Sequence, residues 1–289
     1  MSGDRSNNDI FGGSGSDAGT RAKMTGMPVR NTMKDDFGLD IPTELVPLPS
    51  CGKVYPETSS LHGKEAIEIR PMTAREEDIL TSRALIKKGT VITELIKSCL
   101  IDKSINPDDL ISGDRNAIMT SLRITGYGND YNIEVQCPSC SEKSKQTFNL
   151  SELPIKRLEV EPETYGSNIF SYELPYTKKK IKFKFLDGND ETNINKLQER
   201  SKKSGNKTSN MITLRYRHQI LAVDEITDKT KIQMFIRNMP ARDSRSLRAH
   251  IDSVEPGIDM KAWIECPMCA EQSEVRMPLG ASFFWPDAE

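Results

Sequence analysis

Four of the six cysteines stand in two Cys-Pro-X-Cys pairs that are far apart in the chain. The pairs are Cys137-Pro-Ser-Cys140 and Cys266-Pro-Met-Cys269. Two residues between cysteines allow both thiolates to turn toward one point, and two such turns supply the ligands of a tetrahedral structural zinc. One pair alone would be weak evidence, because redox motifs share its spacing. Together the pairs predict one zinc ion per chain, held by Cys137, Cys140, Cys266 and Cys269.

The residues around the two pairs also match. Each pair is preceded by one apolar and one polar residue, and a glutamate stands two residues after its second cysteine. The matched positions are Val135 with Ile264, Glu142 with Glu271, Phe148 with Met277 and Leu150 with Leu279. The same strand–turn–strand unit therefore occurs twice, and we expect two β-hairpins brought face to face by one metal.

Other readings of the cysteines have different consequences. Two disulfides or two buried thiol pairs would need no metal, but disulfides are rare in a reducing cytoplasm. A thiol oxidoreductase using Cys137 and Cys140 would leave the second pair without a role. Cys99 fits the apolar stripe of a helix as a small core residue, and Cys51 fits a turn. Four thiolates leave no open position on zinc, so catalysis at the metal is not expected.

Familiar catalytic patterns are missing from the chain. The three histidines are His62, His218 and His250, and none stands in a metalloprotease spacing. There is no nucleophile elbow, phosphate-binding loop or dinucleotide-binding fingerprint. The acidic run 76–78 falls in the first turn of an expected helix, where it complements the helix dipole. We therefore expect a protein that is not an enzyme.

Composition restricts the class of protein further. The chain has 289 residues, of which 36% are hydrophobic and 28% charged, and its net charge is −2. A chain with this net charge lacks the overall positive charge that is typical of nucleic-acid-binding proteins. No apolar run approaches the length of a membrane helix, and the N-terminus has no apolar stretch typical of a secretory signal. We expect a protein made in a reducing cytoplasm, with no membrane partner.

Two regions follow from the local patterns. Residues 1–36 are rich in Gly, Ser, Asn and Asp and predict a disordered N-terminal arm. This arm is either a solvated tail or a segment that docks on a partner through Ile10–Phe11 or through 24–33. Residues 37–289 predict one mixed α+β domain, with helices and antiparallel hairpins, closed by the four-cysteine site.

Within this domain the periodicity predicts most elements. Thr73 and Glu76 fit a capping box at the start of a helix that ends at Gly89. Asp114 is expected to cap a later helix that Gly126 and Gly128 end. The remaining expectations are a strand at 66–70, helices at 92–100, 187–203, 212–220, 228–239 and 240–251, hairpins at 133–150 and 170–185, and a last strand from Trp263.

Several strings in this order resemble one known family. They are Leu48-Pro-Ser-Cys-Gly-Lys-Val-Tyr55, Ile69-Arg-Pro-Met-Thr-Ala-Arg-Glu-Glu-Asp-Ile-Leu80, Ile124-Thr-Gly-Tyr-Gly128, Phe235-Ile-Arg-Asn-Met-Pro-Ala-Arg-Asp-Ser-Arg-Ser-Leu-Arg248 and Met277-Pro-Leu-Gly280 with Phe283-Phe-Trp-Pro286. Over about residues 40–286 the chain resembles the T4-type bacteriophage baseplate proteins, the hub and hub-assembly proteins of contractile tails. Cys51 stands where the usual string has a lysine, which weakens any claim for a charge there.

The resemblance implies a structural or assembly protein of the phage baseplate, either a central hub component or a factor that helps to build the hub. Its partners would be other phage tail and baseplate proteins, and its place would be the virion tail. The alternative is a phage regulator that binds nucleic acid through a zinc ribbon. Matched acidic and basic residues and the lack of an aromatic-basic groove favour the baseplate reading.

Three consecutive aromatic residues stand near the end of the chain. On a strand, Phe283 and Trp285 would share one face and Phe284 would take the other. Either all three pack on the core beside the zinc, or one face covers the core and the other contacts a neighbouring baseplate subunit. We treat Phe283, Phe284 and Trp285 as a candidate interface.

Overall fold

The computed structural model describes residues 31–34, 38, 40–203, 210–277, 279 and 281–284. Helices and antiparallel strands alternate along this part of the chain, so the α+β class is confirmed. The helices are α1 (Ala74–Thr81), α2 (Arg83–Lys88), α3 (Val91–Cys99), α4 (Ser112–Tyr127), α5 (Gly188–Lys203), α6 (Met211–Gln219), α7 (Lys229–Asn238) and α8 (Ala241–Val254), with 3-10 turns at Pro107–Asp109, Leu150–Glu152 and Ala281–Phe284.

The strands form small antiparallel sheets. Their bounds are β1 (Asn31–Lys34), β2 (Asp40–Pro47), β3 (Ala66–Ile69), β4 (Asp130–Gln136), β5 (Lys143–Asn149), β6 (Ile155–Lys156), β7 (Phe170–Glu173), β8 (Lys180–Phe183), β9 (Ile220–Val223), β10 (Gly257–Ile258), β11 (Lys261–Glu265) and β12 (Gln272–Arg276). In the described residues the sheet orders are β1-β2-β3, β7-β8-β9, β6-β10, β4-β5 and β11-β12.

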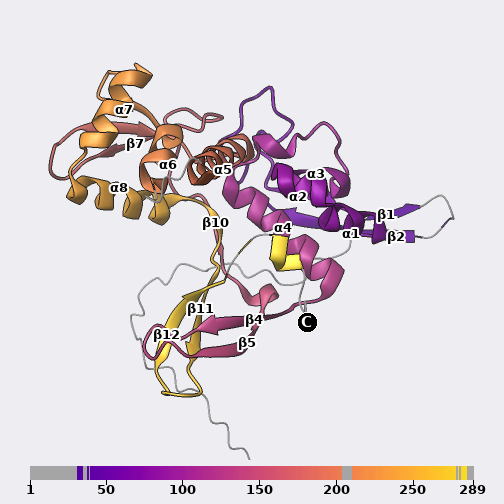
Figure 1. Ribbon diagram of the computed structural model, residues 1–289. Coiled ribbons are helices and arrows are strands. Elements are labelled where there is room, and N and C mark those ends of the chain that lie inside the picture. The colour runs from indigo at the N-terminus through magenta and orange to yellow at the C-terminus, as the bar shows by residue number, and fades with distance from the viewer. Residues whose placement is uncertain are drawn as a thin grey trace, which may run out of the picture.

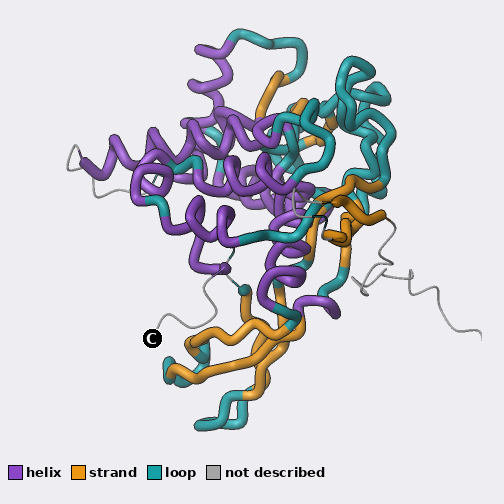
Figure 2. Tube along the Cα trace, turned by 90° about the vertical axis from the view of Figure 1, so that its right-hand side faces the viewer, coloured by secondary structure: helices purple, strands orange, loops and turns teal. Residues whose placement is uncertain are grey.

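Two hairpins extend away from a helical body (Figure 1). Strands β4–β5, which we call hairpin one, and β11–β12, which we call hairpin two, lie together at the lower end of the molecule. The same group of strands projects below the helices after a quarter turn (Figure 2). Helices α1–α4 pack with β1–β3 on one side of the body, and α5–α8 with β7–β9 on the other.

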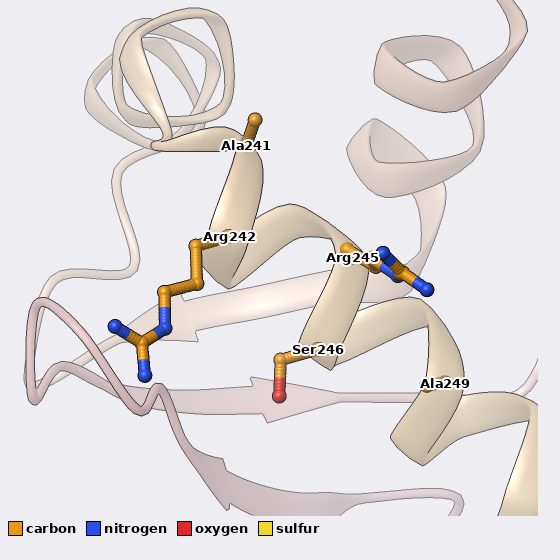
Figure 3. A pocket seen from close by; sticks show the side chains of 5 residues that line it. All are labelled: Ala241, Arg242, Arg245, Ser246 and Ala249. Carbon is orange, nitrogen blue, oxygen red and sulfur yellow. The ribbon is translucent and has the colours of Figure 1, made fainter.

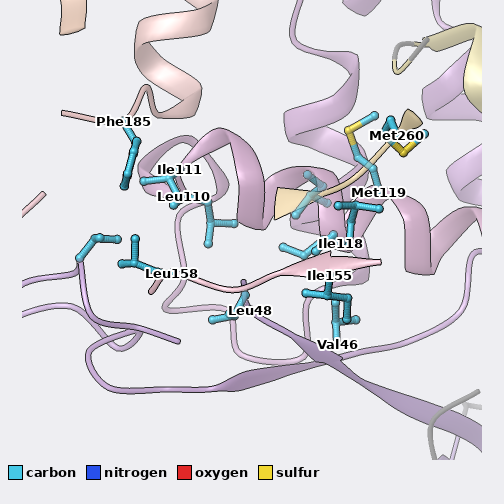
Figure 4. Close-up of a cluster of buried hydrophobic side chains, with 14 of the residues drawn as sticks. Val46, Leu48, Leu110, Ile111, Ile118, Met119, Ile155, Leu158, Phe185 and Met260 are labelled. Carbon is cyan, nitrogen blue, oxygen red and sulfur yellow. The ribbon is translucent and has the colours of Figure 1, made fainter. Parts of the chain in front are cut away.

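The main core lies around α4 and the elements that pack on it. Leu95, Ile96 and Cys99 of α3 are fully buried, as their helical stripe predicts. The core also draws side chains from the segment before α4 and from β6 and the 257–260 segment (Figure 4). The labelled members are Val46, Leu48, Leu110, Ile111, Ile118, Met119, Ile155, Leu158, Phe185 and Met260.

Helix α4 connects the body to both hairpins. After its C-terminal end, Gly128 takes a φ of +84° and leads into β4. At its N-terminal end, Gly113 packs against the segment that leads into β11. A Cβ on Gly113 would lie 1.9 Å from the Pro256 carbonyl oxygen, so only glycine permits this approach. Hairpin one therefore starts from the C-terminal end of α4, and the segment that leads to hairpin two passes the N-terminal end of the same helix.

Several expected elements differ in detail. The helix expected from Thr73 to Gly89 breaks at Ser82, whose φ and ψ are extended, and gives α1 and α2. Ile220, expected at the end of a helix, starts β9, which pairs with β8. The capping box of Thr73 and Glu76 is confirmed: the Thr73 N–H donates to the Glu76 carboxylate at 2.9 Å.

The boundary of the expected arm also differs. Residues 31–34, assigned to a disordered arm, form β1 and pair with Asp40–Thr43 of β2. This pairing moves the start of ordered structure before residue 37. The rest of the expected arm, with Ile10 and Phe11, lies outside the described residues.

Candidate metal centre

The fold brings the four predicted ligands together. The sulfur atoms of Cys137, Cys140, Cys266 and Cys269 all lie within 4.8 Å of one another. Across the two hairpins, the Cys137 and Cys269 sulfurs are 3.8 Å apart, and those of Cys140 and Cys266 are 3.6 Å apart. A tetrahedron with zinc–sulfur bonds of about 2.3 Å has edges of roughly 3.8 Å. The spacing therefore fits four thiolates around one zinc ion.

The two turns that carry the cysteines have the same backbone structure. In the first turn, the Cys137 N–H donates to the Glu142 carbonyl at 2.8 Å and the Ser141 N–H to the Cys137 carbonyl at 2.9 Å. In the second, the Cys266 N–H donates to Glu271 at 3.0 Å and the Ala270 N–H to Cys266 at 2.8 Å.

The residue after each second cysteine is left-handed. Ser141 has a φ of 64° and Ala270 a φ of 54°. This conformation is uncommon for residues other than glycine, and its presence at both positions closes the two loops in the same way. The repeat seen in the sequence is thus a repeat of structure.

The backbone also prepares one thiol for ionisation. The N–H groups of Cys269 and Met268 point at the Cys266 sulfur and lower its pKa to about 7. For Cys269, the Glu271 N–H lowers the pKa, but burial and the neighbouring thiols outweigh it and raise the pKa to about 12. Thiols this close cannot all ionise side by side without a cation. The donor set therefore fits a soft divalent cation such as zinc.

No disulfide joins the cysteines of this site in the structure. A disulfide needs a sulfur–sulfur distance near 2.05 Å, and the cross-hairpin distances are much longer. All six cysteines are free thiols. Cys99 is buried on α3 as expected, and burial raises its pKa to about 12. Cys51 lies in a turn with a φ of 52°.

The hairpins meet through their inner faces. Val135 of β4 and Ile264 of β11 are buried there and belong to the main core. At the base of hairpin one, Tyr131 pairs with Phe148. At the matching place in hairpin two, the Met277 N–H donates to the Met260 carbonyl at 2.8 Å. The four clustered cysteines thus lie at the far end of a narrow apolar layer.

A buried arginine secures hairpin one to α4. Arg123 is fully buried, and its guanidinium donates to the carbonyls of Gly128 at 2.9 Å, Asp130 at 3.0 Å and Phe283 at 3.2 Å. It also lies over the Tyr131 ring, 5.9 Å from the centroid. One side chain therefore joins α4, the start of β4 and the C-terminal turn.

This arrangement distinguishes the two readings of the C-terminal aromatics at Phe283 and Phe284. Phe283 and Phe284 lie in a 3-10 turn, not a strand, and both are buried. The Phe283 ring packs edge-on against Tyr131 at 4.9 Å. Both are core residues, as the first of the two readings expects, and neither leaves an exposed face for an interface. Trp285 lies outside the described residues.

A second correction concerns Asp114, which was expected to cap α4. Its carboxylate is fully buried and accepts from the Ser50 N–H at 3.0 Å, the Ser50 hydroxyl at 2.6 Å and the Tyr55 hydroxyl at 2.5 Å. It therefore anchors the 48–55 loop to α4. No local pattern predicts this pairing, because the partners Tyr55 and Ser50 are 59 and 64 residues away.

The histidines occupy structural positions. The His62 ring nitrogen lies 2.7 Å from the Tyr55 carbonyl, and His218 lies 3.1 Å from the Asp190 carboxylate. His250 stacks on Tyr172 with ring centroids 4.1 Å apart. Each ring is thus explained by packing or pairing within the body.

Several hollows in the described residues lie away from the cysteines. One of about 610 Å³ lies between α6 and hairpin two and contains Glu255, whose pKa burial raises to about 7. Charges of both signs surround it, including the ion pair of Glu191 with Arg215 at 3.2 Å, and structural ion-pair networks also shift pKa values.

Another hollow, of about 510 Å³, lies on α8. There Arg242 and Arg245 point to opposite sides and Ser246 points toward the neighbouring strands (Figure 3). The Ser246 hydroxyl lies 2.7 Å from that of Tyr172, so it is already paired. The arginines diverge and do not converge on one point.

Within the described ranges, no helix is both long and apolar enough to span a membrane.

Comparison with known proteins gives one family. The family model described as T4 bacteriophage base plate protein matches residues 53–285, which include all four clustered cysteines. No curated protein and no solved structure matches the chain.

Proposed function

The chain belongs to the T4 bacteriophage base plate protein family, and we propose that it is a structural or assembly protein of the central hub of a contractile-tail baseplate. The observation that carries this proposal is the family match over residues 53–285. The partners would then be other tail and baseplate proteins, met in the bacterial cytoplasm during assembly and, for a hub component, in the finished virion.

In this proposal the metal has a structural role. Cys137, Cys140, Cys266 and Cys269 would hold one zinc ion, whose four sulfur ligands leave no position for a substrate. Such an ion contributes folding free energy, on the order of 10–16 kcal/mol in model zinc peptides. It would join the middle of the chain to its C-terminal region and keep the two hairpins in one orientation.

A role outside catalysis agrees with this arrangement. The tightest constellation of reactive side chains is the cysteine cluster, and a closed zinc site explains it. The buried carboxylates Asp114 and Glu76 hold loops and helix ends together. We therefore propose a protein that works by binding its neighbours, and not an enzyme.

Genetic removal tests the assembly role. Phage that lacks this chain should make heads and tail-tube subunits but no complete baseplates in electron micrographs of infected-cell lysates. Supplying the intact chain from a plasmid should restore contractile tails. Normal tails without the chain would contradict the proposal.

A second measurement separates the two forms of the proposal. Mass spectrometry of purified virions should detect the chain at a fixed number of copies if it is a hub component. If it acts only during assembly, it should be present in infected cells and missing from virions whose baseplates depend on it.

A further inference from the structure

A large aromatic side chain on hairpin two lies in solvent. Trp263 of β11 is 71% exposed, although tryptophan is usually well covered in folded proteins. In the described part of the chain, its ring contacts no other aromatic ring or cation and its indole N–H has no acceptor. The exposed position therefore does not serve the packing of the body.

The pseudo-repeat supplies an internal control for this position. Hairpin one has the same turns and the same strand pairing, and the residue matching Trp263 there is Glu134. The Glu134 carboxylate forms an ion pair across the hairpin with Lys143 at 2.7 Å, and both side chains are exposed to solvent. Since the same architecture forms with a glutamate, it does not require a tryptophan here.

The turn of hairpin two shows the same difference. Met268 between its two cysteines is 72% exposed, and the matching residue of hairpin one is Ser139. Hairpin two thus shows apolar side chains to solvent at two places where hairpin one shows polar ones. Tryptophan and methionine are enriched at protein interfaces, and tryptophan in particular at their energetic centres.

Charged residues of both signs surround Trp263. On its face of the hairpin, which we call the outer face, Lys261 and Arg276 are balanced by Glu265 and Glu274. The Lys261 and Glu274 side chains form an ion pair at 3.4 Å beside the indole. A neutral, mixed rim around one aromatic ring matches a protein surface. Phosphate-rich polymers and anionic membranes favour a basic surface.

We propose that the outer face of hairpin two is a docking surface whose central side chain, Trp263, inserts into an apolar pocket of another baseplate protein. The pocket would carry an acceptor for the indole N–H and charges of both signs at its rim. This inference rests on the proposed function. It also gives the zinc site a purpose, because the metal fixes the direction in which hairpin two presents the tryptophan.

Substitution by the matched residue of hairpin one tests this surface. In a phage that lacks the chain, full-length Trp263→Glu should give at least about a tenfold lower yield of complete baseplates than the intact chain. Trp263→Phe should restore most of the yield, and Glu134→Ala, at the matched place in hairpin one, should leave it unchanged. The purified Trp263→Glu protein should carry the same zinc content as the intact protein, although the new carboxylate opposite Glu274 should lower its melting temperature slightly.

Each other outcome overturns the proposal in a different way. A normal yield with Trp263→Glu, against a defective phage that lacks the chain, removes the docking surface and leaves the assembly role. Lost zinc in Trp263→Glu, or in Trp263→Phe a melting temperature well below that of the intact protein, makes Trp263 a structural residue. Normal baseplates without the chain overturn both proposals.

Two further measurements test whether the outer face of hairpin two binds nucleic acid or a second copy of the chain. Quenching of Trp263 fluorescence by a single-stranded oligonucleotide, measured in a Trp285→Phe protein, would assign the face to nucleic acid. Concentration-dependent dimers that Trp263→Glu abolishes, seen by light scattering, would assign it to a second copy.

Discussion

The body and the hairpin end are stabilised in different ways. Around α3 and α4, apolar side chains pack in a continuous core and buried carboxylates hold loops in place. In the hairpins, by contrast, most strand residues are exposed and only a narrow inner layer is buried. Two-stranded hairpins are marginal in water by themselves. A metal bound by the four cysteines at the tip would add the stability that this thin buried layer lacks, and the two ends should therefore respond to different perturbations.

The largest difference in stability between the hairpins and the body should come from substituting one of the four cysteines. Cys266→Ser removes one of four sulfur ligands, and we expect loss of the metal and several kcal/mol of stability. The loss should concentrate in the hairpins. Hydrogen exchange should speed up in β4–β5 and β11–β12 while α3 and α4 stay protected. Cys99→Ser, which changes a thiol of the body, serves as the control and should keep the metal.

A substitution at Asp114 should instead lower the stability of the body and leave the metal in place. Asp114→Ala leaves the Ser50 N–H and the Tyr55 hydroxyl buried without their acceptor, and we expect a loss of about 2 kcal/mol or more. The midpoint of urea unfolding should fall while the zinc content stays at the level of the intact protein. Asp114→Asn retains one acceptor oxygen and should lose less. Metal loss in the alanine variant would show that the stability of the hairpin end depends on the stability of the body.

Acid should weaken the body through Glu76. Burial would raise its pKa, but hydrogen bonds from Arg70, Ser98 and Thr73 outweigh this and hold the pKa at about 2. The folded-state pKa is thus below its unfolded value. The stabilisation is complete above pH 4.5 and is lost as the pH falls toward 2, by about 3 kcal/mol. Urea unfolding at a series of pH values should show this slope, and Glu76→Gln should reduce it.

The smallest expected effect is at a helix end. Gly89 ends α2 with a φ of +70°, and a Cβ there would meet open space. Gly89→Ala should therefore cost about 1 kcal/mol through backbone conformation alone. Thermal unfolding would measure it. An unchanged or higher melting temperature would mean that the turn relaxes without cost.

The sequence predicted the features that repeat at short range. The apolar stripe of α3, the capping box at Thr73 and the two cysteine turns depend on residues within about ten positions of one another, and all were found where expected. The four sulfurs could be placed together from sequence because metal ligation needs matched turns, however far apart they stand in the chain.

Hydrogen bonds between residues far apart in the chain could not be predicted from the sequence. Asp114 with Tyr55, and Arg123 with the Phe283 carbonyl, join segments that no periodicity connects. Phe283 and Phe284 were wrongly read as part of a strand because large aromatic residues in a row do not distinguish a strand from a buried 3-10 turn. The exposed Trp263 was read only as the start of a strand, since exposure depends on the whole fold.

The metal content of the purified protein tests the central claim most directly. Elemental analysis of protein purified without added metal should find about one zinc per chain, and Cys266→Ser prepared in parallel should hold far less. Protein that is folded, contains no zinc and melts at the same temperature with or without a chelator would contradict a structural zinc site at these four cysteines.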